Sequence, residues 1–142
     1  MAYEDKRTIL IRRVHNRLDD VFDIRGSTLA YLSEVVVDDG MISAKVRSQC
    51  PEVPVEAFDY LEKVLAEEVQ RYDLCQRIGE RFSQRFPTET RLLRAMVDEV
   101  VDKGEITAGT RKFFELEDQT EAREYLEQIA REELESQSGN QD

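Results

Sequence analysis

The sequence is poor in the residues that interrupt regular structure and in those that build covalent or metal sites. It has three prolines, six glycines, two cysteines, one histidine and no tryptophan among 142 residues. So few prolines and glycines leave little material for tight turns, which favours long helices over a sheet of many short strands. The two cysteines, Cys50 and Cys75, are too few for a disulfide framework and indicate a reducing compartment.

Long apolar runs are also missing. No stretch approaches the roughly 18 apolar residues of a membrane span. The first residues are charged where a secretory signal would be apolar. We therefore expect a cytoplasmic protein that makes no contact with a membrane.

Few residues are suited to catalysis or metal binding. A single histidine, His15, gives little support for a Ser-His-Asp triad or a zinc site with histidine ligands. The turns around Gly40 and Gly104 resemble the middle of an EF-hand loop. Their twelfth position would be Val46 or Thr110, however, and neither supplies the carboxylate that calcium requires. We expect no catalytic residue, no cofactor, no metal and no enzymatic activity.

Apolar and charged residues are both plentiful. Hydrophobic residues make up 40% of the chain and charged residues 36%, which is enough apolar material for a packed core. The formal charge is −11, from 31 acidic against 20 basic residues. A field of this sign disfavours non-specific binding along nucleic acid and favours basic partners or none.

The chain carries an internal repeat. Residues 10–47 and 74–111, offset by 64, are identical at 12 of 38 positions. Residues 56–69 and 121–134, offset by 65, are identical at seven of 14 positions. Because chance gives roughly one identity in seventeen, the agreement indicates two copies of one unit.

The repeated positions are those that a helix buries. Each copy has apolar residues spaced by three or four along three long segments and one short one. The sequence therefore predicts an all-α bundle of two tandem four-helix units that share one core within one compact domain. The expected parts are a first unit, a second unit and a flexible polar tail: 1–71, 72–135 and 136–142.

Capping residues predict where several helices begin and end. Gly40 and Gly104 are expected to end the second helix of each unit, because glycine accepts the left-handed conformation of a helix stop. Ser43 and Thr107 are expected to cap the short third helices. Hydroxyl groups near 26–28 and at 87–88 are expected to cap the second helices.

Charge differs between the helices of a unit. Segment 71–94 has a net charge of +3, whereas residues 52–69 carry −5 and residues 113–142 carry −8. One interpretation places the basic first helix beside the acidic fourth helix inside the fold, where ion pairs contribute little to stability. The other makes them complementary docking faces between two chains, as in a homodimer.

Two residue groups are candidate partner-binding sites. Four arginines form pairs spaced by four residues, so the guanidinium groups of each pair share one helix face. They could bind carboxylate, phosphate or an RNA backbone, or else the acidic fourth helices. Two adjacent aromatic residues of the second copy are the other candidate, because both cannot comfortably enter one core and would contact either the first unit or a partner. These candidates are Arg13, Arg17, Arg77, Arg81, Phe113 and Phe114.

These features predict a non-enzymatic protein–protein interaction module, an adaptor or regulatory subunit that acts through helix faces. Its partner would be another protein or a second copy of the chain. The alternative is a nucleic-acid-associated regulator that uses the arginine-rich first helices.

Overall fold

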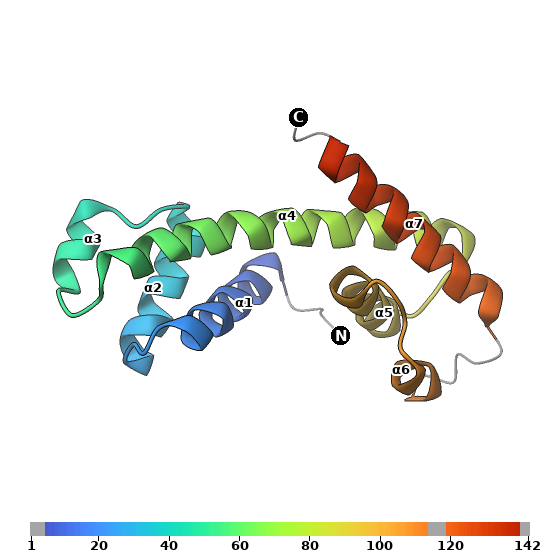
Figure 1. The fold of residues 1–142 in the computed structure, drawn as a ribbon, viewed down its shortest axis with the longest axis horizontal. Coiled ribbons are helices and arrows are strands. Elements are labelled where there is room, and N and C mark those ends of the chain that lie inside the picture. The colour runs from blue at the N-terminus through green and yellow to red at the C-terminus, as the bar shows by residue number, and fades with distance from the viewer. Residues whose placement is uncertain (1–4, 114–118, 140–142) are drawn as a thin grey trace. The chain divides into compact units, whose positions relative to one another are not determined.

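The computed structural model describes residues 5–113 and 119–139, and every regular element among them is a helix (Figure 1). The all-α prediction is confirmed. The chain divides into two compact units, Met1–Tyr72 and Asp73–Asp142. The helices are α1 (Lys6–Val21), α2 (Gly26–Asp39), α3 (Ala44–Gln49), α4 (Val55–Arg85), α5 (Thr90–Lys103), α6 (Ala108–Phe113) and α7 (Thr120–Gly139).

The described residues form seven helices where eight were expected. The fourth helix of the first unit and the first helix of the second are one continuous helix, α4, of 31 residues. Residues 55–85 contain no proline and only one glycine, Gly79, so nothing in this segment ends the helix. The unit boundary at Tyr72 therefore falls within a helix.

The buried apolar side chains form two clusters, one in each unit. The first unit closes its cluster with α1, α2, the α2–α4 connection and the start of α4. The second uses the end of α4, α5 and α7. The largest fully buried side chains are Leu18, Leu29, Leu32, Ile42 and Leu61 in the first unit and Phe82, Ile78, Leu126 and Ile129 in the second.

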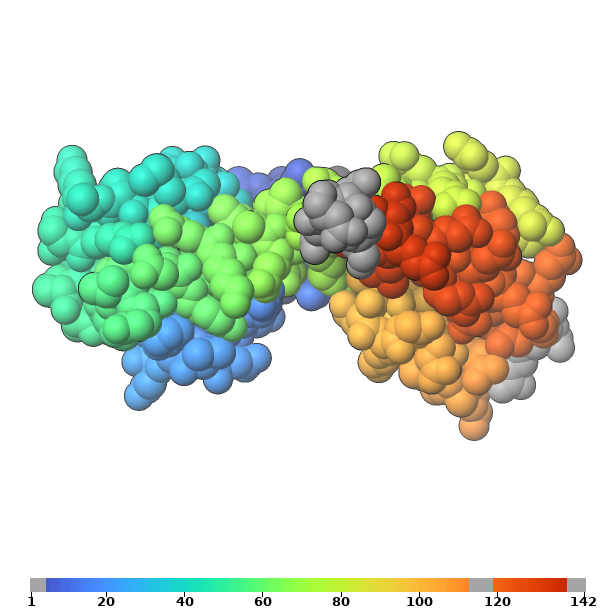
Figure 2. All heavy atoms as spheres, turned by 45° about the horizontal axis from the view of Figure 1, so that its top comes forward, coloured from blue at the N-terminus to red at the C-terminus, as the bar shows by residue number. Residues whose placement is uncertain are grey.

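In the second unit, α7 packs on the last part of α4. Figure 2 shows the atoms of α7 (red) directly against the yellow-green atoms of α4, and ion pairs join the two helices. The α7 helix continues to Gly139, so residues 136–139 are helical where a frayed tail was expected.

The glycine stops are confirmed. Gly40 and Gly104 both have φ of 80°, and their amides donate to Val36 and Val100. In each unit a further hydrogen bond joins the turn to the acidic helix. The amide two residues after the glycine donates to a glutamate of that helix. These bonds join Ile42 N to Glu62 Oε2 (2.9 Å) and Ile106 N to Glu127 Oε2 (3.2 Å).

The expected caps of the second helices are wrong. Arg25 precedes α2 without a side-chain cap, and Glu89 caps α5 by accepting from the amide of Leu92. Thr88 instead donates its hydroxyl to the carbonyl of Phe86. Ser43 caps α3 as predicted, because its hydroxyl accepts from the amide of Val46.

None of the helices in the described part is long and apolar enough to cross a bilayer.

Candidate functional site

The arginines of α1 meet a pair of glutamates on α4. Arg13 donates through Nε to Glu68, and Arg17 donates to both Glu67 (2.6 Å) and Glu68 (3.1 Å). Glu68 is only 4% exposed. Burial lowers the pKa of Arg17, but the hydrogen bonds that Arg17 donates to Glu67 and Glu68 outweigh this effect and leave its pKa raised.

The second unit contains the same arrangement between α4 and α7. Arg77 donates to Glu133 (3.0 Å), and Arg81 donates to Glu133 (3.0 Å) and Glu132 (2.7 Å). The hydrogen bond from Arg81 lowers the pKa of Glu132, and the same bond raises the pKa of Arg81. The interpretation that these guanidinium groups meet the acidic helices of their own chain is therefore confirmed.

The aromatic pair cannot be placed as a site. The backbone of Phe113 ends α6. Its side chain, and Phe114 as a whole, lie outside the described residues.

The cysteines lie in ordinary surroundings. Cys50 is buried in the first cluster, and this burial, with a smaller effect from Glu52, raises the pKa of its thiol. Cys75 is partly buried, with its Sγ 3.8 Å from Asp98 Oδ1. A raised pKa of this kind is the opposite of what a reactive thiol has, so Cys50 is not a candidate nucleophile.

A hollow of about 410 Å³ with several charged side chains in its lining lies between α1 and α2. Arg7, Arg12 and His15 contribute to its lining, together with the carboxylate of Glu34. The guanidinium group of Arg7 is held by both oxygens of Asp38, at 2.6 and 3.0 Å. The hollow is therefore lined by charges of both signs, and the charge of Arg7 is already neutralised by Asp38.

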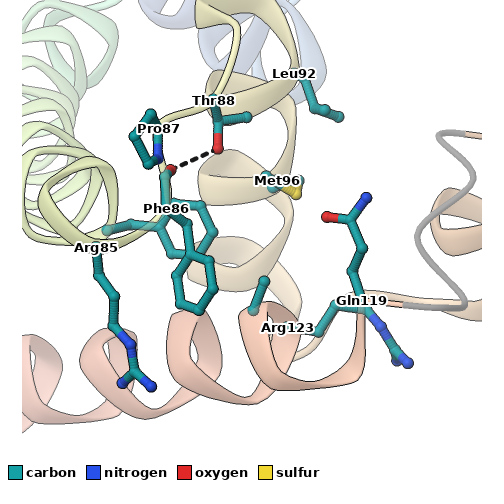
Figure 3. Close-up of a pocket in the computed structure, with 10 residues that line it drawn as sticks. Arg85, Phe86, Pro87, Thr88, Leu92, Met96, Gln119 and Arg123 are labelled. Carbon is teal, nitrogen blue, oxygen red and sulfur yellow. Dashed lines mark hydrogen bonds between the residues drawn. The ribbon is translucent and has the colours of Figure 1, made fainter.

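A smaller pocket, of about 190 Å³, opens in the second unit between the end of α4, α5 and the start of α7 (Figure 3). Its inner wall is apolar, with the buried side chains of Phe82 and Met96 at its base. An engineered apolar cavity of about 150 Å³ holds one benzene ring, so this pocket has room for one side chain. Its lining also includes Arg85, Phe86, Pro87, Thr88, Leu92, Gln119, Ala122 and Arg123.

The aromatic side of the pocket is continuous with a cluster of three rings. The ring of Phe86 stacks on Phe82 at 5.4 Å and lies 5.8 Å from that of Tyr125. The Arg85 guanidinium lies over the rings of Phe86 and Tyr125, 5.2 and 4.7 Å from their centres, and donates to Glu121 at 2.6 Å. These contacts hold a cation at the rim of an apolar wall.

The rim carries two arginines, and Arg85 is ion-paired with Glu121 just outside the lining. Arg85 and Arg123 are the charged residues among the described lining, and no described lining residue is acidic. Arg123 also donates to the hydroxyl of Thr120 at 3.1 Å. The geometry combines an apolar hollow with guanidinium donors, which suits an apolar side chain beside a carboxylate.

The pocket lies where the two similar segments of the sequence, 10–69 and 74–134, differ. At the offset of 65, Arg123 corresponds to Phe58, which is 2% exposed in the first cluster. At the offset of 64, Thr88 corresponds to Ile24, which packs against the same cluster. Sequence reasoning missed the pocket, although the exchange of phenylalanine for arginine at a buried position was a signal.

Among the described residues no group of three or more histidine, cysteine, aspartate or glutamate side chains is arranged to hold a metal ion. No protein family, curated protein or solved structure matches the chain.

Proposed function

We propose that this chain is a tandem duplication of one helical unit that works as a non-enzymatic protein–protein interaction module in the cytoplasm. The second unit supplies the binding site, which is the pocket between α4, α5 and α7. The observation that carries the proposal is the apolar pocket with Arg85 and Arg123 at its rim.

The arginine pairs of α1 and α4 support this choice of site. Their guanidinium groups bind Glu67 and Glu68 in the first unit and Glu132 and Glu133 in the second. A phosphate backbone would have to displace these carboxylates, one of which is buried. Protein binding at the pocket is therefore favoured over nucleic-acid binding at the arginine helices.

The expected ligand is a segment of a partner that carries one bulky apolar residue between carboxylates. The apolar residue would fill the pocket, and a carboxylate would accept hydrogen bonds from a guanidinium group at the rim. Burial of one side chain with one exposed ion pair corresponds to a dissociation constant on the order of 1 mM for a short peptide.

A titration of the ¹⁵N-labelled chain with two short peptides tests the proposal. One peptide has phenylalanine between two glutamates, and the other has the same residue between two lysines. The acidic peptide should shift the amide signals of Thr88, Leu92 and Met96, and the basic peptide should leave them in place. Equal shifts with both peptides, or none with either, would refute the proposal.

The repeat provides a matched control. The double variant Thr88→Ile, Arg123→Phe places in the second unit the residues that the first unit has at these positions. It should fill the pocket and remove the response to the acidic peptide. The helical circular dichroism of the variant shows whether it is folded, and Arg123→Phe alone replaces it if it is not.

A further inference from the structure

The pocket requires a partner that presents an apolar residue next to carboxylates, and the first unit of this chain displays such a residue. Met41 is 54% exposed. It follows two exposed acidic residues, Asp38 and Asp39, at the end of α2. The position that corresponds to Met41 in the second unit is Glu105. The exposed methionine is therefore a feature of the first unit that the repeat does not require.

We infer that the pocket of one chain binds the turn at Asp39–Met41 of a second copy, so that the protein associates with itself head to tail. This inference rests on the proposed function and adds the identity of the partner. Met41 would enter the apolar hollow, and the carboxylate of Asp39 would face one of the guanidinium groups at the rim.

The turn is held in shape on both sides of Met41. Gly40 has φ of 80° and donates its amide to Val36 at 2.8 Å, and the amide of Ile42 donates to Glu62 at 2.9 Å. A side chain displayed on a rigid turn loses little backbone entropy when it binds. The turn is thus prepared for docking in a way that a loose loop is not.

The chemistry of the two surfaces is complementary. A flexible thioether side chain adapts to irregular apolar hollows and makes favourable contacts with aromatic edges, which Phe82 and Phe86 provide. A guanidinium group carries five N–H donors, and the hydrogen bond from Arg85 to Glu121 uses one of them. Its contact with Glu121, which is largely exposed, therefore does not prevent a second carboxylate from approaching.

Val21 and Val55 are competitors for the role of anchor. Val21 is 56% exposed beside Asp20, and Val55 is 62% exposed beside Glu56; the counterpart of Val55 in the second unit is Thr120. Both branched side chains are short and stiff, so they reach less far into a hollow than methionine does. Met41 is therefore the anchor that we assign.

The pocket and the turn are different surfaces, so the contact is heterologous. Such contacts produce rings or open chains, and the average mass rises steadily with concentration. One anchor and a few charges predict a dissociation constant on the order of 0.1 to 1 mM. The net charge of −11 on every copy opposes association at low ionic strength, so the measurement belongs near 0.15 M salt.

Sedimentation equilibrium of the full chain from about 10 µM to about 2 mM is the first test. The weight-average mass should start at 16.6 kDa and rise with concentration. Met41→Glu, which copies Glu105, should lower the association constant by at least about tenfold, which corresponds to losing one buried side chain. Val55→Thr, which copies Thr120, should leave it unchanged.

A mixing experiment then tests which two surfaces meet. The Met41→Glu chain keeps the pocket, and the Thr88→Ile, Arg123→Phe chain keeps the Met41 turn. Each variant alone should remain monomeric up to about 2 mM, a concentration on the order of the highest dissociation constant expected. An equimolar mixture of the two should form a one-to-one dimer. Formation of the dimer in the mixture alone supports the inference.

Three results would overturn it: a wild-type mass that is independent of concentration, a Met41→Glu chain that associates like the wild type, or a mixture that stays monomeric. If the acidic peptide still binds the pocket in any of these cases, the proposed function stands and only the identity of the partner is wrong.

Discussion

Removal of the buried carboxylate of Glu68 should destabilise the chain far more than the same change at Glu133. Both side chains accept two hydrogen bonds from an arginine pair four residues apart. They differ in burial, at 4% exposed for Glu68 and 18% for Glu133. The two alanine substitutions therefore compare one contact in two environments.

The magnitude follows from what each substitution leaves behind. A hydrogen bond to a charged group contributes about 1.5 to 3 kcal/mol, and a buried partner left without one costs more. Arg13 and Arg17 are partly exposed and regain water, so Glu68→Ala should lower the free energy of unfolding by about 2 to 3 kcal/mol. Glu133→Ala, whose partners are more exposed, should lower it by about 1 kcal/mol.

Urea unfolding followed by circular dichroism at 222 nm measures both losses, and amide hydrogen exchange assigns each one to its unit. Both changes replace glutamate by alanine within a helix, so the difference in helix propensity cancels. Salt screens exposed charges over a range on the order of 0.05 to 0.5 M. Raising the salt across this range should reduce the loss of unfolding free energy in Glu133→Ala more than in Glu68→Ala. Equal losses, or a loss at Glu68 below that at Glu133, would refute the argument from burial.

Three further predictions concern local geometry and pH. Gly104→Ala should destabilise the second unit by about 1 kcal/mol, because Gly104 has φ of 80°. Gly109 lies in open space within α6, so Gly109→Ala should stabilise the unit by about 0.5 kcal/mol. Thermal unfolding measures both effects. Burial raises the pKa of Glu99, but hydrogen bonds from Thr110 and Thr107 outweigh it and leave that pKa lowered. The ionised carboxylate of Glu99 therefore stabilises the fold above the ordinary carboxyl pKa, and this stabilisation is lost as the pH falls through the lowered pKa. In Glu99→Gln, the free energy of unfolding measured with urea should fall less steeply over this acidic range.

The helices could be predicted from the spacing of apolar residues, but their number could not. Leu10, Val14 and Leu18 mark one buried stripe, and Leu74, Ile78 and Phe82 mark its counterpart; all six side chains are buried. Apolar spacing indicates which face of a helix is buried and says little about where the helix stops. Without a proline or a suitably placed glycine between the fourth and fifth expected segments, the backbone hydrogen bonds simply continue.

The contacts of the arginine pairs could be predicted, whereas the pocket could not. Arg13 and Arg17 share a helix face by their spacing, and the acidic segment contains adjacent glutamates, so charge alone indicated the pairing. The pocket depends on side-chain volume that is missing at Thr88 and Arg123, and identities between the two similar segments cannot reveal a gap. Comparison of the positions at which these segments differ, above all Phe58 with Arg123, is what locates the pocket.

The helix that runs through the unit boundary couples the folding of the two halves. Starting a helix from coil is about a thousand times less favourable than extending one, which corresponds to about 4 kcal/mol. The unit that folds first provides the other with a helix end that is already formed. The cost of starting a helix is therefore incurred once for α4 and not once in each unit. The two cores can therefore stabilise each other through the backbone of one helix.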